Sequence, residues 1–143
     1  MTTFSLNSVL KGYPLSVLTC IAIWILSLAP IGKLEIVQNA NLSDKWAHFI
    51  MYGGLVLVIW GEWLWHRRRS GGETAGHSAA LFSLAVWVYV GTVAMSGLLE
   101  LLQAYCTTYR SGDWIDLAAN AIGAALGTVL GLLATLLLRQ KRQ

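Results

Sequence analysis

The sequence contains few charged residues. Asp, Glu, Lys and Arg make up 12% of its 143 residues, and 56% of the residues are hydrophobic. A soluble domain usually carries about 25% charged residues. The mean hydropathy is +0.59, so the apolar mass exceeds what one small core needs. The sequence therefore predicts an integral membrane protein with a single domain over residues 1–143.

The sequence also lacks the short motifs of common metal sites, nucleophilic enzymes and RNA-binding proteins. It has no Cys-x-x-Cys pair, no His-x-x-x-His pair, no serine-nucleophile motif and no aromatic-basic RNA motif. Its two cysteines, Cys20 in an apolar run and Cys106 in a polar connection, should lie at different depths, so no disulfide is expected. We predict no metal, no cofactor and no nucleic-acid partner. No catalytic residue is identified, and the balance is against an enzyme.

Four apolar runs follow one another along the chain. Each is close to the roughly 20 residues that cross a bilayer core as a helix. The sequence therefore predicts an all-α, four-helix membrane bundle with spans at about 13–30, 46–65, 79–102 and 114–138. The first run is short, and the sequence around Ala29 also fits a signal-peptide cleavage site; Pro30 directly after it favours a retained span.

Lysine and arginine are distributed unevenly between the two sides that four spans define. Lys33, Lys45 and Arg110 fall on one side. The side with both termini and the middle loop has seven: Lys11, Arg67, Arg68, Arg69, Arg139, Lys141 and Arg142. Because basic residues favour the cytoplasmic side, we expect cytoplasmic termini in a bacterial inner (cytoplasmic) membrane, crossed several times by the chain.

Ten polar residues are expected near the extracytoplasmic ends of the spans. Most of them are separated by three or four residues along a helix, so they share one helix face, whereas Lys45 can turn toward the headgroups and Arg110 lies in a connection. Charges near the end of a span are costly unless they are paired, hydrated or functional. We therefore predict that these side chains converge on one ligand-binding pocket. The candidates are Asp44, Lys45, His48, Tyr52, Glu100, Gln103, Arg110, Asp113, Asp116 and Asn120.

Two further patterns concern helix packing. Gly123, Gly127 and Gly131 repeat every four residues, a spacing of small residues that lets membrane helices approach closely. We expect this face to contact another span of the same chain, with a dimer interface as the alternative. Tryptophans near the span ends are interpreted as interfacial anchors, namely Trp46, Trp60, Trp63 and Trp65.

The polar residues form three motifs in chain order. They read Asp44-Lys45-x-x-His48-Phe49-x-x-Tyr52, then Glu100-x-x-Gln103, then Arg110-Ser111-x-Asp113-x-x-Asp116-x-x-x-Asn120-x-x-Gly123. These motifs resemble those of the VanZ-like family over about residues 44–131. The resemblance implies a small polytopic membrane protein of the cell envelope. The family takes its name from a member linked to low-level teicoplanin resistance, and it implies no particular biochemical activity.

Three functions remain open from the sequence. The favoured one is binding of membrane lipids or of a lipid-linked envelope precursor, with an effect on glycopeptide susceptibility. Arg110 or Lys45 would contact a phosphate, and the acidic groups would accept hydrogen bonds from sugars or amines. Because acidic groups are in surplus, we expect a zwitterionic or sugar-bearing headgroup.

The two alternatives use the same residues differently. A membrane enzyme would use His48 as a general base and Glu100 as an acid. In one version of that enzyme, a metal would be held by His48, Glu100, Asp113 and Asp116. A structural protein would use the polar groups to lock the helix ends, as a homo-oligomer or as an accessory subunit of a larger membrane complex.

Overall fold

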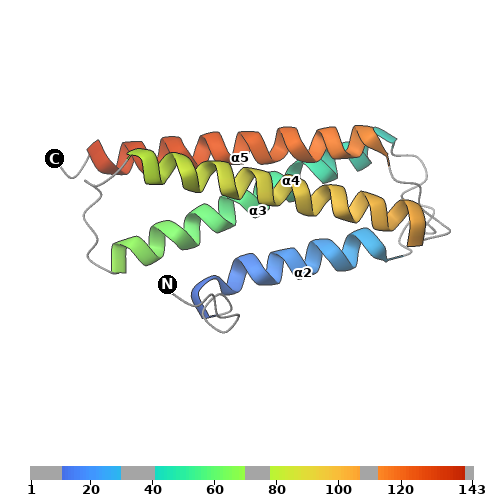
Figure 1. The fold of residues 1–143 in the computed structure, drawn as a ribbon, viewed down its shortest axis with the longest axis horizontal. Coiled ribbons are helices and arrows are strands. Elements are labelled where there is room, and N and C mark those ends of the chain that lie inside the picture. The colour runs from blue at the N-terminus through green and yellow to red at the C-terminus, as the bar shows by residue number, and fades with distance from the viewer. Residues whose placement is uncertain (1–10, 30–40, 70–77, 107–112, 141–143) are drawn as a thin grey trace.

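The structure is a computed structural model, and it describes residues 11–29, 41–69, 78–106 and 113–140. Of residues 41–44 and 78–79, only the helical backbone is described. The elements are four helices: α2 (Pro14–Leu28), α3 (Asn41–Arg69), α4 (Ser78–Cys106) and α5 (Trp114–Gln140). Within these ranges no strand is present, and the prediction of an all-α, four-helix membrane bundle is confirmed (Figure 1).

Successive helices run in opposite directions along the bundle (Figure 1). The N-terminal end of α2 and the C-terminal end of α5 therefore lie at the same end, as the four-run interpretation requires. The opposite end holds the ends of α2 and α4 and the beginnings of α3 and α5. The side of the membrane that each end faces stays a prediction.

Three of the helices are long and apolar enough to cross a membrane: Lys45–Arg69, Ala80–Cys106 and Trp114–Gln140. The helix α2 is apolar but has only 15 residues. At 1.5 Å per residue it extends about 22 Å, less than the roughly 30 Å of a hydrocarbon core. A complete first span over 13–30 therefore stays a prediction. The helix α3 begins at Asn41, before the expected span at 46–65. It therefore includes polar residues that precede the apolar run.

The most extensive helix contact joins α3 to α5. Glycines on α5 make this close approach possible. A Cβ atom at Gly127 would lie 2.7 Å from the Gly53 carbonyl oxygen, and one at Gly123 would overlap the backbone of Phe49. At Gly131 it would overlap the Trp60 ring. The glycine repeat therefore contacts another helix of the same chain, as expected, and it is buried there.

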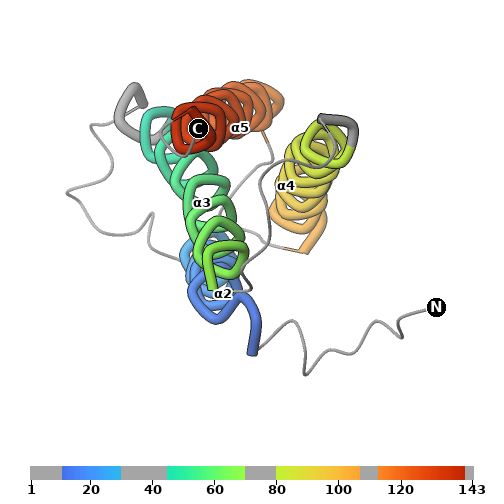
Figure 2. Tube along the Cα trace, turned by 90° about the vertical axis from the view of Figure 1, so that its left-hand side faces the viewer, coloured from blue at the N-terminus to red at the C-terminus, as the bar shows by residue number. Residues whose placement is uncertain are grey.

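The helix α3 lies between α2 and α5, and α4 lies beside α5 (Figure 2). Two apolar clusters join the helices. One contains Val56, Trp60 and Ala124, and the other contains Ile23, Tyr52, Leu55 and Leu99. The interpretation of Trp60 as an interfacial anchor is wrong, because its ring is buried against α5 in the space that Gly131 leaves. Trp46 and Trp65 are exposed, as an anchor requires.

The N-terminal end of α2 is held by a carboxylate from α3. Glu62 accepts hydrogen bonds from the Leu15 and Ser16 backbone N–H groups, at 2.7 and 2.9 Å, and from the Ser16 hydroxyl at 2.5 Å. The first N–H groups of a helix have no partner within that helix, and a negative charge there is favourable. Glu62 therefore fixes α2 against α3.

Cys20 is half-buried in α2 and Cys106 is exposed, and both are free thiols as expected.

Candidate functional site

The polar residues predicted from the sequence gather at one end of the bundle. They come from the N-terminal parts of α3 and α5 and from the C-terminal part of α4, which lie together in the antiparallel arrangement of Figure 1. The members whose side chains interact are Lys45, His48, Glu100, Asp113, Asp116 and Asn120. We call these six residues the polar cluster. Its formation follows from helix spacing, because each helix presents its members on one face.

Lys45 links two carboxylates of α5. Its Nζ atom lies 3.1 Å from Asp113 Oδ2 and 3.0 Å from Asp116 Oδ1. The lysine and Asp113 side chains are partly exposed, whereas Asp116 is largely buried. The ion pairs join the beginnings of α3 and α5, so part of the acidic surplus predicted from the sequence is neutralised within the chain.

His48 is held by an amide on α5. Its Nδ1 atom lies 3.1 Å from Asn120 Oδ1, and Asn120 Nδ2 donates to Ser96 Oγ at 2.7 Å. All three side chains are buried. Since Asn120 uses its NH₂ group on Ser96, its oxygen faces His48, and the network assigns the proton to Nδ1. His48 Nε2 then faces Asp116 Oδ2 across 3.9 Å.

Asp113 begins α5 as a capping residue. Its Oδ1 atom accepts the Ile115 backbone N–H at 2.9 Å, the side-chain contact of an N-cap. The Asp113 backbone N–H in turn donates to Glu100 Oε2 at 3.1 Å. The Ile115 N–H, followed by the Lys45 ammonium, holds the pKa of the Asp113 carboxyl below its ordinary value. Asp113 is therefore a structural group of the cluster as well as a candidate ligand contact.

Of the other four candidates, two have partners outside the polar cluster and two cannot be placed. Gln103 Nε2 donates to the Ser27 carbonyl oxygen at 2.8 Å, which joins α4 to the end of α2. The Tyr52 ring belongs to an apolar cluster, and its hydroxyl group forms a hydrogen bond with Ser96, which also accepts from Asn120. Arg110 lies outside the described residues, and the Asp44 side chain is likewise not described. The sequence prediction missed Ser96, although it lies four residues before Glu100 and this spacing marks the same helix face.

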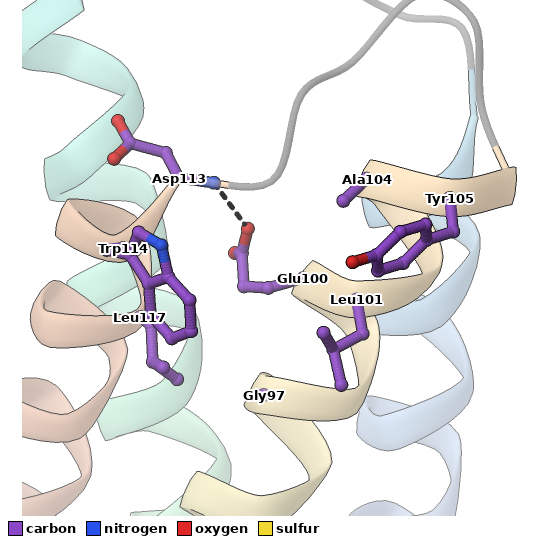
Figure 3. A pocket seen from close by; sticks show the side chains of 8 residues that line it. All are labelled: Gly97, Glu100, Leu101, Ala104, Tyr105, Asp113, Trp114 and Leu117. Atoms are coloured by element: carbon purple, nitrogen blue, oxygen red, sulfur yellow. Dashed lines mark hydrogen bonds between the residues drawn. The ribbon is translucent and has the colours of Figure 1, made fainter.

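A pocket of about 290 Å³ opens between α4 and α5 beside the cluster (Figure 3). Leu101 and Tyr105 extend into it from α4, Trp114 and Leu117 from α5, and Glu100 lies between them. The Tyr105 and Trp114 side chains are 84% and 80% exposed. The pocket therefore combines a carboxylate with apolar and aromatic walls that remain accessible. A second cavity, lined in part by Lys11, Glu62, His66 and Arg69, lies at the other end of the bundle.

The geometry and the motifs agree with one family of membrane proteins. The model of the VanZ/LLP1 family matches residues 7–137. The chain belongs to the VanZ/LLP1 family. The match includes all four helices apart from the last residues of α5, and with them every residue of the polar cluster. Comparisons with curated proteins and with solved structures give no significant match.

The VanZ/LLP1 assignment confirms the resemblance seen in the sequence, and the three long apolar helices support a membrane location. It assigns no ligand to the pocket. Three members of the polar cluster nevertheless have the chemistry of metal ligands, because atoms of His48, Glu100 and Asp116 all lie within 4.8 Å of one another. Both the pocket and this triad are therefore considered below.

Proposed function

We propose that this VanZ/LLP1 protein binds the headgroup of a membrane lipid or of a lipid-linked envelope precursor in the pocket between α4 and α5. The observation that carries the proposal is the composition of the pocket walls. Glu100 and Asp113 provide polar groups, whereas Leu101, Trp114 and Leu117 provide apolar surface. An amphipathic molecule needs both, since its headgroup requires hydrogen-bond partners and its chains require apolar contact.

The size of the pocket favours a headgroup over a whole lipid. Its volume of about 290 Å³ is at the lower end of the roughly 300–1,000 Å³ typical of small-molecule sites. The acyl chains would remain along the exposed apolar faces of α4 and α5, which include Leu98, Leu101 and Ile122. The pocket therefore suits a ligand that enters sideways from the bilayer.

The charge of the walls favours a headgroup with an amine or with sugar hydroxyls. Among the residues that the structure describes, the charged ones that line the pocket are Glu100 and Asp113, and carboxylates accept hydrogen bonds from such groups. Lys45, 3.1 Å from Asp113, provides a nearby positive charge for a phosphate. A zwitterionic or sugar-bearing ligand meets both requirements, in agreement with the preference drawn from the sequence.

The proposal places the pocket at the extracytoplasmic face of a bacterial cytoplasmic membrane, with cytoplasmic termini. The support is the excess of basic residues on the side of the termini and middle loop. In that location, binding of a precursor would alter glycopeptide susceptibility, as the resemblance to the VanZ-like family suggests. Removal of the gene and its return on a plasmid should shift the inhibitory concentration of teicoplanin in opposite directions. Equal concentrations in both strains would reject this part of the proposal.

The binding proposal is tested by native mass spectrometry of the protein released from its own membrane. Wild type should retain a defined lipid or precursor, and Trp114→Ala should lose it because the substitution removes one wall of the pocket. Trp87→Ala is the matched control, since Trp87 is a similarly exposed tryptophan of α4 outside the pocket. Equal retention by the folded variants would reject the site.

A structural function is favoured by a separate observation. Lys45 satisfies Asp113 and Asp116 within the chain, so the polar cluster already joins α3 to α5. On this account the protein would serve as a subunit of a larger membrane complex, and the cluster would fix the shape of the bundle. The same experiment separates the two functions, because a structural cluster predicts no retained lipid in wild type.

A further inference from the structure

We propose that His48, Glu100 and Asp116 form a binding site for one divalent transition-metal cation. The three residues come from α3, α4 and α5, and one ligand atom of each lies within 4.8 Å of the others. Their side chains are buried, with exposed fractions of 3%, 8% and 8%. Lys45 already compensates part of the charge of this set through Asp116 Oδ1, and a divalent cation is a further positive charge that an imidazole and two buried carboxylates can hold.

The orientation of His48 is the first argument for a cation. The Asn120 amide holds Nδ1 and is itself fixed by Ser96, so the lone pair of Nε2 is directed away from Asn120. Nε2 faces Asp116 Oδ2 at 3.9 Å, beyond hydrogen-bond distance. The position between the two atoms suits a positive charge, either a proton on Nε2 or a bound cation, and the metal titration below distinguishes the two.

The surroundings of the triad are the second argument. Ligands of protein-bound metals are usually held by hydrogen bonds from a second layer of residues. Here Asn120 contacts His48, Lys45 donates to Asp116 Oδ1, and the Asp113 backbone N–H donates to Glu100 Oε2. Lys45 uses Oδ1, whereas His48 faces Oδ2, so the ion pair leaves Oδ2 directed towards the histidine.

The distances fit a small cation. Ligand atoms about 2.0–2.2 Å from zinc lie about 3.4 Å apart in a tetrahedral site. The separations of up to 4.8 Å exceed this value by about 1.5 Å at most, which side-chain rotation can close. One imidazole nitrogen with two carboxylates suits zinc, manganese or iron(II) better than calcium.

This site departs from the favoured expectation of no metal, and it uses three of the four ligands named in the metal-enzyme alternative. The sequence alone did not favour that alternative, because the three ligands come from three helices and form no short motif. The triad shares Glu100 with the proposed lipid pocket, but the two proposals are tested separately. The metal triad is tested by metal content and affinity, and the lipid pocket is tested through Trp114, which is not a ligand.

The test uses Zn²⁺ alone as the probe. Protein in detergent is treated with a chelator, separated from it and titrated with Zn²⁺ by calorimetry, with elemental analysis of the complex. Wild type should bind about one Zn²⁺ per chain. His48→Gln and Asp116→Asn should each weaken binding by at least tenfold, and Asn120→Ala should weaken it by about 10- to 100-fold, the usual effect of losing a residue that orients a ligand.

His66→Gln is the matched control, because His66 lies on the same helix but near the other end of the bundle, where it contacts the Gly12 carbonyl oxygen. This variant should bind Zn²⁺ as wild type does. Because substitution of a buried ligand can impair folding, Co²⁺ absorption by wild type provides a second measurement. Visible bands of nitrogen-ligated, four- or five-coordinate Co²⁺ would support the site. Absence of stoichiometric metal in wild type, or equal affinity in wild type and folded ligand variants, would overturn it.

Discussion

The Nδ1 atom of His48 lies 3.1 Å from the Oδ1 atom of Asn120, and Asn120 is held in turn by Ser96. These contacts join α3, α5 and α4 inside the bundle. Because buried amides and imidazoles are costly without partners, the arrangement fixes both the rotation of the histidine ring and the register of three helices. It therefore fixes the position of one member of the triad, His48.

We predict that Asn120→Ala lowers the free energy of unfolding by about 1–3 kcal/mol, because the substitution leaves His48 Nδ1 and Ser96 without this partner. Chemical unfolding in detergent measures the change. A double-mutant cycle with Ser96→Ala separates the contact from loss of volume. The two substitutions should be less costly together than the sum of the single ones, and strict additivity would contradict the proposed network.

We predict that Gly127→Ala destabilises the bundle by about 1–3 kcal/mol, the usual cost of overpacking. The added methyl group would lie 2.7 Å from the Gly53 carbonyl oxygen and 3.0 Å from Val56 Cβ, so α3 and α5 must separate. Gly91→Ala is the control, because no atom lies within 4 Å of its added methyl group. It should be neutral or stabilising. Similar losses in both variants would argue against the close helix approach.

Removal of the Glu62 side chain should release the beginning of α2. Glu62→Ala leaves the Leu15 and Ser16 donors without their acceptor, at a cost of about 1–3 kcal/mol. The natural thiols report the effect, since Cys20 is half-buried in α2 and Cys106 is exposed at the end of α4. Maleimide labelling of Cys20 should accelerate in Glu62→Ala while that of Cys106 stays constant. An unchanged ratio of the two rates would contradict the capping role.

Asp113 should contribute to stability in a pH-dependent way. Its pKa in the folded protein is lower than the ordinary 3.8, through the Ile115 N–H and then the Lys45 ammonium. A lowered pKa means that the contribution is fully present above the ordinary value and is lost as the pH falls through the lowered one. Asp113→Asn keeps a capping acceptor but loses the charge. The difference in melting temperature between wild type and Asp113→Asn should therefore shrink from pH 7 to pH 3, and a constant difference would contradict this role.

The sequence was sufficient to predict the helices and most members of the polar cluster, because these features are specified by patterns within single helices. Apolar runs of membrane length specify spans, and spacings of three and four residues place His48 near Lys45, and Asp116 near Asn120, on common faces. The glycine repeat likewise predicted the close contact that Gly127 makes with Gly53. Each of these features can be recognised within one helix.

The features that could not be predicted depend on contacts between helices. Glu62 caps α2 from 46 residues away, and no local pattern marks this role. Trp60 has the sequence position of an interfacial anchor, but the space left by Gly131 accommodates its ring. The pairing of His48 with Asn120 also depends on how α3 and α5 are rotated against each other. Periodicity specifies a helix face but not the partner opposite it.

The most direct test of the central claim is photo-crosslinking in the native membrane from two positions of α4. A photoreactive phenylalanine analogue replaces Leu101, which lines the pocket, or Leu98, which does not. The two residues are 51% and 48% exposed, so both should contact lipid. Position 101 should capture one lipid or precursor species far above its share of the membrane, whereas position 98 should capture the bulk composition. The same bulk composition at both positions would contradict a headgroup-binding pocket.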